Sequence, residues 1–87
     1  MNHKRLNTLN DFYTLSENDH VLIIDKDNKM LNAIILESPH RYKFTDIHEM
    51  WVDIPSENLE LPIGINKYLN HNGWFRSIFK EDKRCLV

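Results

Sequence analysis

The stretch that decides the fold is HVLIIDKDNKMLNAIILESP, residues 20–39. It holds two apolar runs, His20–Asp25 and Met30–Leu36, and a polar segment rich in Asp, Asn and Lys separates them. Two short apolar runs that flank turn residues are typical of a β-hairpin. We therefore expect an antiparallel pair of strands over residues 20–36. Ser38-Pro39 should end the second strand, because proline has no backbone N–H.

Further alternating segments follow this hairpin. Residues 41–45 (RYKFT) place Tyr42 and Phe44 on the same face of a strand. In residues 49–54 (EMWVDI) one face is wholly apolar, and the other carries Glu49, Trp51 and Asp53. Residues 59–61 (LEL) are expected to add a short final strand.

Beyond Pro62 the apolar residues recur at the spacing of a helix. They are Ile65, Tyr68 and Leu69, followed by Trp74, Phe75, Ile78 and Phe79. This spacing predicts one or two C-terminal helices, with Asn72-Gly73 as a terminator between them. A terminal strand over residues 74–80 is the alternative. Similar spacing near the N-terminus predicts that residues 1–12 form a helical or loosely ordered arm.

These segments predict an α+β fold in a single domain, residues 1–87. The expected core is a small antiparallel sheet or SH3-like partial barrel of four to five short strands (about residues 20–61), followed by one or two C-terminal helices. The order of HVLIID, MLNAIILES, RYKFT and MWVDIPSENLEL resembles the strand order of SH3-like and Tudor-like barrels. We attach no function to this resemblance.

The composition of the chain indicates which kind of partner and which cellular compartment to expect. The formal net charge is −2, whereas proteins that rely on the phosphate backbone usually carry a basic excess. A single cysteine, Cys85, permits no disulfide within the chain, which favours a reducing compartment, and we expect the cytoplasm. The apolar runs are much shorter than the about 20 residues that cross a bilayer, so we expect no membrane partner.

The sequence has no pattern that points to an active site or a metal. The five histidines show no HExxH spacing, and Cys85 has no second cysteine to pair with. There is no nucleophile elbow or P-loop, and Gly64 and Gly73 are the only glycines. We interpret the chain as a protein that is not an enzyme and that needs no metal or cofactor.

Trp51 is the most informative candidate for binding. Period-two alternation places it opposite the apolar face of its strand, between Glu49 and Asp53, where an exposed tryptophan would anchor a partner. The alternative is that the C-terminal helices cover this face and make Trp51 a core residue. Our predicted partner-binding residues are Trp51, Glu49, Asp53, Tyr42 and Phe44.

The leading hypothesis for function is a small protein-binding module that acts by steric occlusion, such as an inhibitor, an immunity or anti-defence factor, or an assembly adaptor. Its partner would be another protein with a basic surface, because the binding face is acidic; a homodimer remains open. The alternative is a small nucleic-acid-binding regulatory domain. That domain would stack bases on Tyr42, Phe44 and Trp51 and would use Lys4, Arg5, Arg41 and Lys43 on phosphates.

Overall fold

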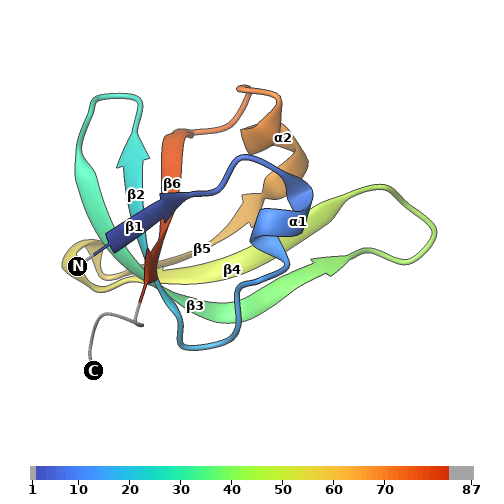
Figure 1. The fold of residues 1–87 in the computed structure, drawn as a ribbon, viewed down its shortest axis with the longest axis horizontal. Helices are drawn as coiled ribbons and strands as arrows, with labels where there is room; N and C mark the ends of the chain where they lie inside the picture. Colours follow the sequence, from blue (N-terminus) through green and yellow to red (C-terminus); the bar gives the residue numbers. More distant parts are fainter. Residues whose placement is uncertain (1, 83–87) are drawn as a thin grey trace.

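The computed structural model describes residues 2–82, and within them an open antiparallel sheet dominates the fold (Figure 1). Its six strands follow the order β1-β6-β2-β3-β4-β5. In chain order the elements are β1 (Asn2–Arg5), α1 (Leu9–Phe12), β2 (His20–Asp25), β3 (Met30–Arg41), β4 (His48–Ile54), the 3-10 helix η1 (Pro55–Glu57), β5 (Leu59–Gly64), α2 (Ile65–Leu69) and β6 (Phe75–Asp82). Neither of the two short α-helices in the described residues could span a bilayer.

The predicted hairpin of residues 20–36 is confirmed. β2 pairs with β3 in antiparallel register, with Val21 opposite Ala33 and Ile23 opposite Leu31. The turn between them is held by the Asp25 carboxylate, which accepts hydrogen bonds from the backbone N–H groups of Asp27 and Lys29 at 2.8 and 3.0 Å. A short polar side chain at the end of β2 therefore fixes the turn and, with it, the register.

The prediction of a fold that ends in C-terminal helices is wrong. After α2, which has five residues, the chain forms the eight-residue strand β6 between β1 and β2. β6 carries apolar residues on both faces: Ile78 is buried in the core, while the partly buried Phe79 lies opposite Leu22 on the other face. Apolar residues on both faces hide the period-two signal, and their spacing then imitates a helix. Gly73 is not a left-handed terminator either, since the positive φ in this segment belongs to His71.

The expected N-terminal arm is a strand and one turn of helix. β1 pairs with β6, and α1 begins at a capping box in which the Thr8 hydroxyl and the Asp11 carboxylate bind each other's backbone N–H groups. The same carboxylate also accepts from the backbone N–H of Asn7, and this hydrogen bond is the main reason why the pKa of Asp11 lies below its ordinary value.

The boundary predicted at Ser38-Pro39 is also wrong. β3 continues through Pro39 to Arg41, and its register against β4 shifts between Ile35 and Glu37 and again between Glu37 and His40. Such bulges free the chain from regular pairing and let a strand carry a proline without an N–H. As a result, residues 42–47 form the β3–β4 loop, and the strand expected over residues 41–45 is absent.

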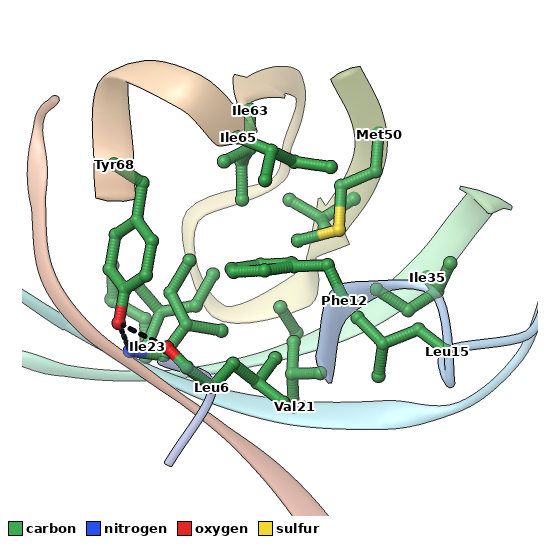
Figure 2. Close-up of a cluster of buried hydrophobic side chains, with 14 of the residues drawn as sticks. Leu6, Phe12, Leu15, Val21, Ile23, Ile35, Met50, Ile63, Ile65 and Tyr68 are labelled. Carbon is green, nitrogen blue, oxygen red and sulfur yellow. Dashed lines mark hydrogen bonds between the residues drawn. The ribbon is translucent and has the colours of Figure 1, made fainter. Parts of the chain in front are cut away.

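The core lies against the inner face of the curved sheet and is closed by α1, α2 and the segments beside them (Figure 2). Its members are Leu6, Phe12, Leu15, Val21, Ile23, Leu31, Ala33, Ile35, Met50, Val52, Ile54, Ile63, Ile65, Tyr68 and Ile78. Phe12 of α1 meets Tyr68 of α2 edge to face, with 5.4 Å between ring centroids. The two helices thus cover the sheet as a pair.

The Tyr68 hydroxyl is the polar centre of this core. It donates to the backbone carbonyl of Leu6 at 3.2 Å and accepts from the backbone N–H of Ile78 at 3.0 Å (Figure 2). The N–H of Leu6 in turn donates to the carbonyl of Ile78 at 2.9 Å. One phenol therefore joins α2, β6 and the segment that follows β1, and it satisfies two buried backbone groups.

We expect Tyr68→Phe to lower the free energy of unfolding by about 1–3 kcal/mol, because it leaves the Leu6 carbonyl and the Ile78 N–H without their partner. Urea denaturation measures the change. Tyr13→Phe is the matched control, because Tyr13 is exposed and its histidine partner can bind water. Equal stability of the Tyr68→Phe variant and the wild type would contradict this role for the phenol.

Candidate functional site

The outer half of the β3–β4 hairpin projects beyond the rest of the sheet (Figure 1). We call residues 37–51 the extension. Its strands pair Glu37 with Trp51, His40 with Glu49, and Arg41 with His48. Two paired strands and a short loop form a projecting element, and the side chains that face away from the core are presented to solvent.

The alternation of β4 sets which side chains these are. Met50, Val52 and Ile54 are buried, so Glu49, Trp51 and Asp53 lie on the opposite, outer face, as the sequence predicts. Trp51 is half-buried and does not belong to the core. The alternative that C-terminal helices cover this face fails, because α2 packs on the inner side through Ile65 and Tyr68.

A single carboxylate oxygen organises the outer face of the extension. Oε1 of Glu49 accepts a hydrogen bond from the Tyr42 hydroxyl at 2.6 Å and another from the Trp51 indole Nε1 at 3.2 Å. His40 stacks edge to face on Tyr42 with 5.6 Å between ring centroids, and its Nδ1 lies 3.6 Å from Oε1 of Glu37. We call Glu37, His40, Tyr42, Glu49 and Trp51 the acidic–aromatic cluster.

The acidic–aromatic cluster raises the pKa of the Tyr42 phenol. Its pKa lies above the ordinary value of 10.0, chiefly because the phenol donates to Glu49, and then because of partial loss of hydration and the negative charges of Glu49 and Glu37. Tyr42 therefore stays a neutral donor, and both carboxylates act on the same small surface.

The raised pKa gives a testable result. The Tyr42 phenol should titrate above 10, and Glu49→Gln should move its pKa back down, because the charge and the ionic acceptor are both lost. The stabilisation from this hydrogen bond should be fully present below the pKa of an unfolded tyrosine and should disappear as the pH rises through the pKa of the folded protein. NMR titration of the Tyr42 ring signals measures it; an unchanged midpoint in Glu49→Gln would contradict the assigned cause.

The tip of the extension presents an uncovered aromatic side chain. Phe44 is 100% exposed and has a left-handed backbone (φ 61°), which is uncommon for a large side chain. The turn beneath it is closed by hydrogen bonds from the backbone N–H of Tyr42 to the Ile47 carbonyl (3.0 Å) and from that of Thr45 to the Tyr42 carbonyl (3.2 Å). Arg41 and Lys43 line a shallow hollow beside Phe44.

Polar contacts brace the extension against the body of the protein. The side-chain amide of Asn66 in α2 donates to the Asp46 carbonyl at 3.0 Å and accepts from the His48 N–H at 2.7 Å. The Tyr13 hydroxyl, at the C-terminal end of α1, lies 2.6 Å from Nδ1 of His48. These contacts fix the base of the extension to the rest of the protein.

Three of the five predicted binding residues contact one another in the structure. Tyr42, Glu49 and Trp51 meet in the cluster, whereas Phe44 lies at the tip and Asp53 lies farther along β4, between Ile34 and Glu60 of the neighbouring strands. The sequence reasoning missed Glu37 and His40. Pairing β3 through Pro39 against β4 would have placed both beside Trp51 and Glu49.

Comparison of the chain with protein-family models, with the curated proteins and with the solved structures gave no significant match. Within residues 2–82, no group of three or more His, Cys, Asp or Glu side chains is arranged to hold a metal ion. Cys85 lies outside the described residues. The extension is therefore the feature of the described residues from which a function can be inferred.

Proposed function

We propose that this chain is a protein-binding module that acts by steric occlusion, and that the extension is its binding element. The observation that supports this most directly is the shared carboxylate oxygen of Glu49, which orients Tyr42 and Trp51 on an outward face. Oriented aromatic side chains need little ordering when a partner arrives, and such residues commonly dominate binding energy.

The chemistry of the cluster favours a lysine or arginine of the partner. A carboxylate offers about four lone-pair positions, and the second oxygen of Glu49 has no bond to a described residue. A cation placed there would meet a charged acceptor, the nearby Glu37 and the ring faces of Tyr42 and Trp51. The partner we infer is therefore a protein with a basic surface segment.

The nucleic-acid alternative receives less support. A nucleic-acid-binding domain would stack bases on Tyr42 and Trp51. Both side chains donate hydrogen bonds to the Glu49 carboxylate, which would repel phosphate. Its four cations are also divided, because Arg41 and Lys43 are on the extension while Lys4 and Arg5 belong to β1. Lys4 lies 3.6 Å from the Asp11 carboxylate, and Arg5 donates to the side chain of Asn7.

The projecting shape suits occlusion better than catalysis. An extension with an exposed phenylalanine at its tip can enter a cleft of another protein, while the body of the sheet blocks the entrance. An inhibitor, an immunity or anti-defence factor, and an assembly adaptor would all use this geometry. The single cysteine is our reason for placing the interaction in the cytoplasm.

The test is capture from nuclease-treated lysate of the native host by the immobilised protein and four variants. Trp51→Ala and Glu49→Gln should each weaken capture of one dominant protein at least about tenfold, because they remove an aromatic anchor and the charged acceptor. The matched controls are Trp74→Ala and Glu17→Gln, which make the same chemical changes at exposed positions off the extension. Both controls should capture as the wild type does.

Three outcomes would contradict the proposal. Capture could disappear with nuclease, which would promote the nucleic-acid alternative. The extension variants and their controls could capture equally, which would exclude the extension. Trp51→Ala could unfold by circular dichroism, which would make Trp51 a structural residue.

A further inference from the structure

A second hollow lies beside β5 on the side of the sheet where α2 packs, and at one end it reaches Glu49 of the acidic–aromatic cluster. It has a volume of about 930 Å³ and runs along β5 toward α2 and the segment that leads into β6. β5 is the last strand of the sheet order, so among the described strands it pairs with β4 alone, and its other edge borders this groove.

The lining of the groove is mostly apolar. Leu31, Ile54 and Ile63 form buried parts of it, and the half-buried Leu61 and Phe75 continue it outward. At the rim, Leu59 is 49% exposed and Trp74 is 86% exposed. Hollows that bind small molecules have this apolar character and volumes of roughly 300–1,000 Å³.

The charged groups of the lining leave one cation without a partner. Glu57 pairs with Lys29, whereas Glu49, at the extension end of the groove, keeps its negative charge and accepts hydrogen bonds from the neutral Tyr42 and Trp51. Lys67 packs its methylene stem close to Gly64, at distances of 3.7–3.9 Å from where a Cβ would lie. Within residues 2–82, no hydrogen bond or ion pair reaches its ammonium group, which is exposed at the rim.

We propose that this groove binds an aliphatic carboxylate, with the chain between β5 and Trp74 and the carboxylate on the Lys67 ammonium. An apolar trough with a single unpaired cation at its rim complements an amphiphile with a negative head. Each buried methylene should tighten binding about fourfold until the trough is filled. The inference goes beyond the proposed protein partner, because its test depends on Lys67 and Trp74, which lie outside the extension, although Glu49 of the acidic–aromatic cluster also lines the groove.

A peptide strand is a poorer occupant of the same groove. A strand added to β5 would rely on its edge N–H and C=O groups, but Pro62 in the middle of β5 has no N–H to give. An alkyl chain needs no such donors. The groove also runs beside apolar side chains rather than a row of polar ones, which is what an alkyl chain requires.

The test uses Trp74 as an internal reporter. In Trp51→Phe, Trp74 is the only tryptophan, and binding in the groove should shift its fluorescence to shorter wavelength in a saturable way. The probes are decanoate, decanol and decyltrimethylammonium, each below its micelle concentration. Calorimetry on the wild-type protein repeats the titrations without relying on either tryptophan.

We expect decanoate to bind at least about fivefold more tightly than decanol, with decyltrimethylammonium weakest. Lys67→Met should remove the preference for decanoate while decanol still binds. Lys26→Met, at an exposed lysine of the β2–β3 turn, should leave the preference unchanged. The inference is overturned if decanoate gives no saturable signal, if the three head groups bind alike, or if Lys67→Met keeps the preference.

Discussion

The buried hydroxyl of Tyr68 is the constraint on which the rest of the structure depends. By binding both the Leu6 carbonyl and the Ile78 N–H, it fixes α2 over the start of the sheet and holds the segment after β1 against β6. β6 can then serve as a central strand between β1 and β2. The sheet is curved, so that one face encloses the core, and the outer half of the β3–β4 hairpin projects beyond it (Figure 1).

Local sequence patterns predicted the elements whose two faces differ. The β2–β3 hairpin and the alternation of β4 were found because each has one buried face, as with Val21 and Ile23 or Met50 and Val52. β6 was mistaken for helix because its apolar residues Ile78 and Phe79 lie on opposite faces of the strand, which hides the period of two. β1 was missed because its polar residues form a strand only through pairing with β6, which is distant in sequence.

The candidate site was likewise predictable only where a local sequence pattern placed its residues. Alternation placed Trp51 beside Glu49 on the outer face, and the structure adds Tyr42 through a hydrogen bond to the same carboxylate. Glu37 and His40 depend on the bulged register through Pro39, which no local pattern reveals. The result is an outward-facing surface on which Glu49 orients two aromatic side chains through hydrogen bonds. The hairpin that carries this surface is fixed to the rest of the protein by the contacts of Asn66.

The most direct test of this account is an NMR titration of the protein with a short lysine-rich peptide, in which the two indole N–H signals are followed together. If the cluster recognises cations, the Trp51 signal should shift in a saturable way and the Tyr42 ring signals should follow it, while the Trp74 signal stays in place. Equal shifts at Trp51 and Trp74, or no shift at Trp51, would contradict recognition of a basic partner by the extension.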